Sequence, residues 1–264
     1  MKAFFISIPH SGERVPPETA WLKELPEEIL MCDVDRYVDQ LYGPVIQDLK
    51  IKHVVTEWHR YAADLNRLPE DLDELSVKGA ESSGRFSPGI GLHWAKTTKG
   101  DVLMPTPMEM NLHKDLVEKY HKPFHEKIKL MYSELKKQGA QKVYQLDAHS
   151  MPSMGTKAHK DPGEERAEIV ISDLKGQSCE ESYKKLVIDS FVRAGFQVKY
   201  NWPYVGGRVT EAYGKPDEGQ HCIQVEINRK LYMNEDTKQI KVEDAKLTSE
   251  KISEAVGLIL KKIL

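Results

Sequence analysis

Two histidines in turn-like strings are the residues of this sequence best suited to bind a metal ion. His10 stands in IPHSGE after an apolar run over residues 3–8, and His149 stands in LDAHSM after an apolar run over residues 143–146. A hydrolytic zinc site needs three protein ligands and an open position for water, so two imidazoles require one further donor. The acids near the first histidine are the candidates for that donor: Glu13, Asp33, Asp35 and Asp39.

A carboxylate within an apolar run is the second chemical signal. Glu226 lies in IQVEINR, where an unpaired carboxylate would be costly to bury. We therefore expect it to pair with a cation, to bind a metal or to take part in catalysis. Asp147, two residues before His149, could orient that imidazole or simply cap the following turn. A single histidine after a strand is more often a hydrogen-bonded structural residue, and this alternative stays open for both histidines.

The elements that must position these residues alternate in type. Short apolar runs predict strands, and apolar residues at helical spacing predict helices, including a long helix over residues 111–137 that is interrupted near Pro123. The predicted strands cover residues 3–8, 53–56, 142–146, 168–172, 196–200 and 222–227, and the other predicted helices cover 35–49, 182–194 and 248–263. This alternation predicts an α/β fold, a three-layer αβα domain with a mixed, largely parallel central sheet.

Parallel sheets bind ligands beyond the carboxyl ends of their strands. The string YAADLNR, with Asp64, Asn66 and Arg67, follows the second predicted strand and so joins the candidates for a shared site. Residues 69–107 are rich in Gly, Ser and Pro and show no clear period. We expect the whole chain, residues 1–264, to be one domain with this stretch as a loop-rich surface insertion.

Composition excludes several classes of protein. The 264 residues are 40% hydrophobic and 30% charged with a formal net charge of −3, which is typical of a globular protein and shows no basic excess for nucleic acid. The sequence contains no run of about 18 apolar residues, so we predict no membrane-spanning helix. The three cysteines are far apart and predict buried thiols. We expect a cytoplasmic protein without nucleic-acid or membrane partners; its oligomeric state stays open.

Six strings, taken together and in order, resemble one known family. They are IPHSG, DVDRYVDQLY, RYAADLNR, LDAHSMPS, NWPYVGG and QVEINRKLYM, and the resemblance around them runs from about residue 3 to residue 233. Each alone is weak, but in this order they resemble the N-formylglutamate amidohydrolase family, zinc-dependent enzymes that release formate from N-formyl-L-glutamate. The resemblance implies a phosphorylase/hydrolase-like fold related to zinc carboxypeptidases and zinc cell-wall amidases.

The same resemblance implies roles for individual residues. It places one zinc ion per chain on His10, Asp35 and His149, with Asp33 and Glu13 as rival acids, and makes Glu226 the general base that passes a proton to the leaving amine. The implied substrate is a small N-acyl amino acid with two carboxylates. Arginine suits such groups because its fork donates two parallel hydrogen bonds. The implied substrate-binding residues are Arg60, Asn66, Arg67, Asn201, Gly206 and Gly207, with structural pairing, caps and tight turns as their alternatives.

One departure from the family pattern concerns the substrate. The family commonly has Thr-Arg-x-Tyr-Gly after the glycine pair, whereas this chain has Glu211 in place of that arginine, with Arg208 three residues earlier. Another N-acyl amino acid, a cell-wall-type amide, or a ligand-binding protein without catalysis therefore remain alternatives.

The other histidines carry weaker signals. His121 and His125 have i,i+4 spacing but no third ligand nearby in sequence, which is typical of packing. His125 also matches a family histidine in KPFHEK. His93, His159 and His221 fall in expected loops and are given no role.

Overall fold

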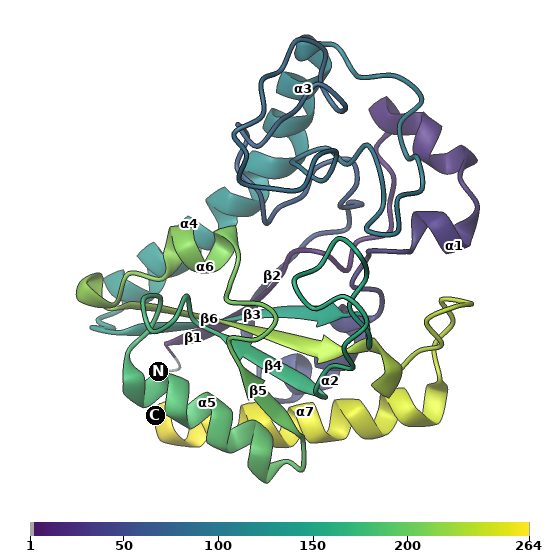
Figure 1. Ribbon diagram of the computed structural model, residues 1–264. Coiled ribbons are helices and arrows are strands. Elements are labelled where there is room, and N and C mark those ends of the chain that lie inside the picture. The colour runs from purple at the N-terminus through teal and green to yellow at the C-terminus, as the bar shows by residue number, and fades with distance from the viewer. Residues whose placement is uncertain (1–2, 264) are drawn as a thin grey trace.

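One six-stranded sheet organises the computed structural model, which describes residues 3–263 (Figure 1). Its strands run in the order β2-β1-β3-β6-β4-β5, and every neighbouring pair is parallel except β4 with β6. The strands are β1 (Phe4–Ile8), β2 (Lys52–Val55), β3 (Val143–Met151), β4 (Ile169–Ser172), β5 (Val198–Tyr200) and β6 (Gln220–Asn228). The predicted mixed, largely parallel sheet is confirmed.

Helices cover both faces of this sheet, as expected when nearly every residue of the central strands is buried. One face packs against α2, α5 and α7, and the other packs against α4 and α6. The α-helices are α1 (Glu27–Leu30), α2 (Val38–Asp48), α3 (Met110–Leu116), α4 (Lys122–Lys137), α5 (Glu181–Arg193), α6 (Arg208–Tyr213) and α7 (Val242–Ile263). Short 3₁₀ turns cover Pro17–Glu24, Pro216–Glu218 and Arg229–Leu231. The predicted three-layer arrangement is confirmed.

The side chains of β1 pack alternately against the helices on the two faces of the sheet. Phe4, Ile6 and Ile8 join the apolar cluster beneath α2, α5 and α7, whereas Phe5 joins the cluster beneath α4 and α6. Successive side chains of a strand point to opposite faces, so an apolar run without alternation fills both cores at once. The three cysteines are unpaired and buried, as predicted.

The predicted long helix is indeed interrupted before Pro123. A π-helical turn over Val117–His121 separates α3 from α4. Proline lacks a backbone N–H, so it is tolerated in the first turn of α4 but interrupts the hydrogen-bond ladder of a continuous helix. Helix α7 is longer than predicted because it begins at Val242. In residues 3–263, no helix combines the length and the apolar character that crossing a bilayer requires.

The stretch over residues 69–107 differs from the expected surface excursion. Within the described chain it holds no helix or strand, yet Val77, Leu92 and Leu103 are at most 1% exposed. These side chains belong to two apolar clusters that also draw on α3 and on the segment after β2. In Figure 1 the stretch forms a lobe beside α3, above the carboxyl ends of the strands. It is therefore a packed part of the molecule that borders the strand ends.

Candidate active site

Three adjacent strands bring the proposed histidines and the proposed base together. His10 follows β1, and β1 pairs with β3, in which His149 lies. The prediction that His149 follows its strand is wrong, because β3 continues to Met151. His149 lies directly opposite Glu226 in the pairing of β3 with β6. Residues distant in sequence thus meet at the carboxyl edge of the sheet, where ligands of α/β proteins bind.

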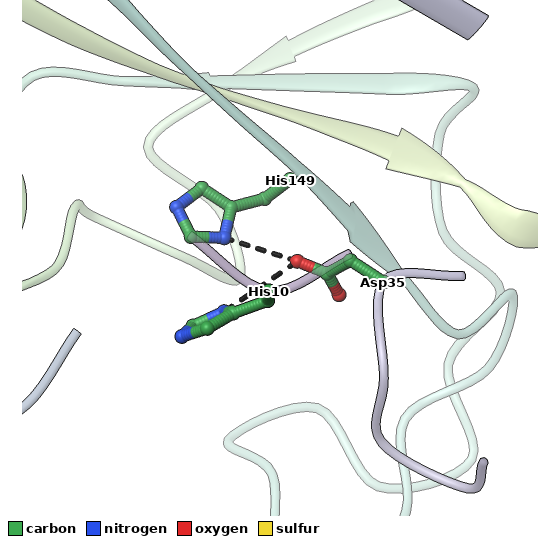
Figure 2. A group of neighbouring side chains, drawn as sticks. All are labelled: His10, Asp35 and His149. Carbon is green, nitrogen blue, oxygen red and sulfur yellow. Dashed lines mark hydrogen bonds and ion pairs between the residues drawn. The ribbon is translucent and has the colours of Figure 1, made fainter. Parts of the chain in front are cut away.

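Asp35 completes a compact group with the two histidines (Figure 2). Its backbone N–H donates to the carbonyl of His10 over 3.0 Å, which fixes the segment before α2 against the end of β1. Its Oδ2 lies 3.1 Å from Nδ1 of His149 and 3.5 Å from Nδ1 of His10. All three side chains are buried, and one ligand atom from each lies within 4.8 Å of the others.

The rival acids point elsewhere. The carboxylate of Asp33 accepts a hydrogen bond of 2.7 Å from the hydroxyl of Tyr61. Glu13 and Asp39 line a different hollow of the surface. Of the four candidate acids, Asp35 is the one whose carboxylate faces both histidines.

The outer nitrogens of both imidazoles are held by further carboxylates. Nε2 of His10 lies 2.7 Å from Oδ1 of Asp64, and Nε2 of His149 lies 2.8 Å from Oδ2 of Asp147. Each contact leaves Nδ1 as the nitrogen that faces Asp35. Metal-binding histidines commonly donate their second N–H to a carboxylate in this way, which fixes the ring and strengthens the ligand. For Asp147 the sequence offered this arrangement as one alternative, whereas nothing singled out Asp64 as a partner of His10.

The charges in this group favour a bound cation. Burial alone would raise the pKa of Asp35, but the hydrogen bonds and charges of His10 and His149 hold that pKa well below its usual range. Burial would lower the pKa of His149, but the charges of Asp147 and Asp35 raise it well above its usual range. Positive charge is therefore strongly stabilised at this point.

The donor set fits a zinc ion. Around zinc bound tetrahedrally at about 2.0–2.2 Å, ligand atoms lie roughly 3.3 Å apart, and Asp35 Oδ2 lies at comparable distances from the two Nδ1 atoms. Two imidazoles and one carboxylate are a ligand set typical of hydrolytic zinc sites, which leave the fourth position to water or substrate. His10, Asp35 and His149 are the residues that could hold the ion.

Glu226 stands beside this group in a cavity of about 160 Å³. Its side chain is buried, and Oε1 accepts a hydrogen bond of 2.7 Å from Nε2 of Gln224. Burial, reinforced by the negative charge of Asp35, raises the pKa of Glu226 to about 7, although His149 and Arg229 oppose the shift. A buried carboxylate whose pKa is raised in this way can accept and return a proton within the cavity.

The same cavity is lined by most of the residues proposed to bind substrate: Arg60, Asn66, Arg67, Gly206 and Gly207. Asn201 is not among them. It lies after β5 with a φ of 52°, and its amide donates over 3.0 Å to Asp173. Its amide oxygen also accepts from the backbone N–H of Asp173 over 3.2 Å. Asn201 therefore stabilises a turn outside the cavity and is not a candidate for substrate binding there.

The two proposed arginines differ in what they already bind. Arg60 donates to the Asp33 carbonyl over 2.7 Å and to Oδ2 of Asp64 over 2.8 Å, so it supports the carboxylate that orients His10. Arg67 donates from Nε and Nη1 to backbone carbonyls at 3.3 and 3.4 Å. Its Nη2 has no hydrogen-bond partner in the part of the chain that the structure describes, and it is the guanidinium most available to a ligand.

A third guanidinium was missed by the sequence reasoning. Arg229 is 5% exposed, lines the cavity and donates from Nη2 to Oδ1 of Asp35 over 3.0 Å. Its Nη1 and Nε donate to the Cys32 carbonyl and to Ser150. It fixes the Asp35 carboxylate from behind. The signal was its place in QVEINRKLYM, three residues after Glu226, although nothing in that string shows the contact.

Gly207 is required by a close approach rather than by its backbone angles. A Cβ atom there would lie 2.2 Å from Nδ2 of Asn66. Oδ1 of Asn66 accepts a hydrogen bond of 2.9 Å from the backbone N–H of Val209 and so caps α6 from a distant segment. Gly206, with a φ of 125°, adopts a conformation that side chains disfavour. Asn66 thus has a structural bond on its oxygen and also lines the cavity.

Glu211 does not reach the cavity. Its side chain is 57% exposed and forms an ion pair with Arg208 on the surface of α6. His125 also lies outside the cavity, where Nε2 contacts the Leu65 carbonyl over 3.0 Å. The acid that departs from the family pattern is therefore not positioned to contact a ligand in this cavity.

Four lining residues come from three loops and were not predicted: Trp94 and Thr98 from the stretch over residues 69–107, His159 from the loop before β4, and Tyr204 from the loop after β5. Nε1 of Trp94 donates over 3.0 Å to Asp64, so the lobe beside α3 contacts the carboxylate that lies behind His10. Loop residues have no periodic pattern, which is why the sequence did not reveal these contacts.

Comparison with known proteins identifies the family of this chain. A family model described as N-formylglutamate amidohydrolase matches residues 2–233. The chain is 28% identical over 234 residues to an N-formylglutamate deformylase of Pseudomonas putida, covering 87% of this chain and 81% of the relative. An N-formylglutamate deformylase of Pseudomonas aeruginosa is 26% identical over 237 residues, covering 87% and 82%.

Two crystal structures share the fold. N-formylglutamate amidohydrolase from Ralstonia eutropha matches with a TM-score of 0.84 at 24% identity, covering 99% of this chain and 92% of that one. A gene product from Agrobacterium tumefaciens matches with a TM-score of 0.70 at 18% identity, with the same coverage. The family match spans the strands, both histidines and the acidic residues of the site. The chain therefore belongs to the N-formylglutamate amidohydrolase family, enzymes that hydrolyse a non-peptide amide bond.

Proposed function

We propose that this protein is a zinc-dependent amidohydrolase that cleaves N-formyl-L-glutamate to formate and L-glutamate. The observation that carries the proposal is the buried group of His10, Asp35 and His149 beside Glu226, in a chain of this family. The substrate is supported by the relatives, two of which are named N-formylglutamate deformylases. One zinc ion per chain would occupy the site.

The protein residues divide the remaining work among them. When bound, zinc supplies Lewis acidity toward the acyl carbonyl and toward water. Glu226 accepts a proton from the water that attacks the acyl carbon, and it returns that proton to the amine nitrogen as the carbon–nitrogen bond breaks. Arg67 holds a substrate carboxylate through its free Nη2, and the amide of Asn66 lies in the same cavity.

Arg60 and Arg229 act behind the reacting groups. Arg60 donates to Asp64 and so holds the carboxylate that orients His10. Arg229 donates to Asp35 and so holds the proposed zinc ligand. Their guanidinium groups also offset part of the negative charge that these acids concentrate in the site. We therefore propose them as positioning residues rather than as the main carboxylate contacts.

Two measurements on the purified protein test this proposal. Metal analysis should give about one zinc per chain, and incubation with N-formyl-L-glutamate should release formate. Glu226→Gln should lower kcat by about 10²–10⁴-fold, because proton transfer by a positioned carboxylate contributes about that much. The variant should keep its zinc, since Glu226 is not one of the three ligands.

Glu211→Gln is the matched control. It removes the same charge from an exposed side chain outside the cavity and should leave kcat and KM within about twofold. Full activity in Glu226→Gln would show that the base is wrong. Tight binding of N-formyl-L-glutamate to zinc-loaded protein without any turnover would favour a ligand-binding member of the family instead.

A further inference from the structure

An N-acyl acidic amino acid carries two carboxylates, and the guanidinium groups of the cavity are unequally available to them. Arg60 is bound to Asp64. Arg229 is bound to Asp35 and to two backbone carbonyls. Arg67 keeps a terminal nitrogen free of protein partners among residues 3–263. One available cation for two carboxylates leaves a place for a further donor.

His159 lines the same cavity from the loop over residues 152–168, which joins β3 to β4. The backbone N–H of Thr156 donates to Nδ1 of His159 over 3.0 Å. A backbone amide can only donate, so Nδ1 is the acceptor of the ring and the proton resides on Nε2. The Thr156 hydroxyl lies 2.7 Å from the same Nδ1 and 3.1 Å from the Thr98 carbonyl in the lobe beside α3, and its single proton serves one of these acceptors at a time.

The ring is neutral and its remaining donor is free. Burial, together with the charge of Arg166, lowers the pKa of His159 to about 4. The imidazole therefore carries one N–H at neutral pH, on Nε2. In the described part of the chain, no protein atom accepts a hydrogen bond from that group, and the side chain is half-buried. Nε2–H is therefore a donor at the wall of the cavity that water can meet and that a ligand acceptor can take over.

The loop that carries His159 is held firmly. Arg166 forms a bidentate ion pair with Asp161 over 2.7 and 2.8 Å, and its Nη1 donates to the Tyr204 hydroxyl over 2.9 Å. The ring of Tyr204 packs edge-on against that of His159, with centroids 6.1 Å apart. A ligand that uses this imidazole therefore meets a donor whose position is already set.

We propose that His159 is a substrate-binding residue whose Nε2–H donates to the substrate carboxylate that Arg67 leaves unpaired. The proposal rests on the proposed function, which supplies a substrate with two carboxylates. A neutral N–H that donates to a carboxylate makes a charge-assisted hydrogen bond, stronger than one between neutral groups.

Two variants separate the roles of the two ring nitrogens. Glutamine places an amide nitrogen near the position of Nε2, whereas asparagine reaches only as far as Nδ1. His159→Asn should raise KM for N-formyl-L-glutamate by about 10-fold or more with kcat within about threefold. His159→Gln should restore KM to within about threefold of the wild-type value. Thermal unfolding of both zinc-loaded variants shows that they are folded.

Substrate analogues identify the carboxylate. N-formyl-L-glutamine lacks the side-chain carboxylate, and N-formyl-4-aminobutanoate lacks the α-carboxylate. The KM increase in His159→Asn should disappear with the analogue whose missing carboxylate is the one bound by His159. An equal increase for all three substrates, a loss of kcat with unchanged KM, or no recovery with glutamine would overturn the proposal.

The outcome stays distinct from that of the proposed function. If the wild-type protein hydrolyses none of the three substrates, the proposed reaction has failed, and binding is measured instead. Titration calorimetry of L-glutamate against zinc-loaded wild type and His159→Asn then tests the contact alone. Weaker binding by the variant supports the carboxylate contact, and equal binding overturns it.

Discussion

At the scale of single residues, carboxylates behind the histidines support the three groups proposed to bind zinc. Asp147 and Asp64 contact Nε2 of their histidines, and this contact leaves Nδ1 to face Asp35. An imidazole whose outer N–H is held by a carboxylate is a stronger donor at its other nitrogen, and its ring is fixed in orientation. The pattern predicts an effect on metal affinity from residues that never touch the metal.

Asp147→Asn should weaken zinc binding by about 10–100-fold, because a neutral amide polarises His149 less and holds its ring less firmly. Competition with a chromophoric chelator measures this affinity directly. Asp73→Asn is the control, since Asp73 is equally buried but only accepts backbone N–H groups of a turn away from the site. It should lower stability and leave zinc affinity unchanged. Wild-type zinc affinity in Asp147→Asn would refute the orienting role.

At the scale of elements, helix α6 depends on a contact that chain order does not suggest. Asn66 caps its first turn, and Gly207 leaves room for that side chain. The glycine pair thus joins a short helix to the segment that carries Arg67, and the cavity wall depends on both. Substitution of one glycine should therefore affect both stability and the site.

Gly207→Ala should destabilise the protein by about 1–3 kcal/mol, because the new methyl group overlaps the amide of Asn66 and forces it to move. KM for N-formyl-L-glutamate should rise in the same variant. Gly257→Ala is the matched control: it lies within α7, and an added Cβ meets nothing within 4 Å. It should stabilise by about 0.5–1 kcal/mol, as alanine does within a helix. Urea unfolding of both variants checks the opposite signs.

Elements were more predictable than their contacts. The apolar runs predicted all six strands, and Pro123 predicted the interruption before α4, because burial and backbone chemistry act locally. The extent of β3 was underestimated, because His149 is polar yet lies within a strand whose neighbours supply its partners. The contact between Asp64 and His10 spans 54 positions, and no local pattern encodes it.

At the scale of the whole molecule, buried neutral histidines connect stability to pH. Burial lowers the pKa of His59 and of His93 to about 3, and both residues are fully buried. In the unfolded chain their pKa lies near 6.5. Between these values the unfolded state binds more protons than the folded state, so stability falls as pH falls.

The free energy of unfolding should therefore decrease from pH 6.5 to pH 4.5, with each of these histidines contributing up to about 1.4 kcal/mol per pH unit. Urea titrations across this range measure the slope. His93→Gln should show a shallower slope than the wild type under the same metal conditions, because it removes one titrating ring. Identical slopes in the two proteins would contradict the assignment of His93 as a neutral core residue.

The lobe over residues 69–107 shows the limit of sequence reasoning at this scale. Its Gly, Ser and Pro content predicted a surface loop, yet Leu92 and Trp94 are buried. Packing of an irregular segment depends on surfaces supplied by α3 and by the chain after β2, which no window of the sequence contains. The same lobe places Trp94 against Asp64, and the sequence could not predict this contact of the site for the same reason.

The position of β6 links synthesis of the chain to its chemistry. It is the last strand in sequence, yet it occupies the middle of the sheet between β3 and β4, and it carries Glu226. A nascent or prematurely ended chain that lacks β6 has no continuous sheet and lacks Glu226, the proposed proton acceptor. Completion of the central sheet and delivery of that carboxylate therefore depend on the same strand.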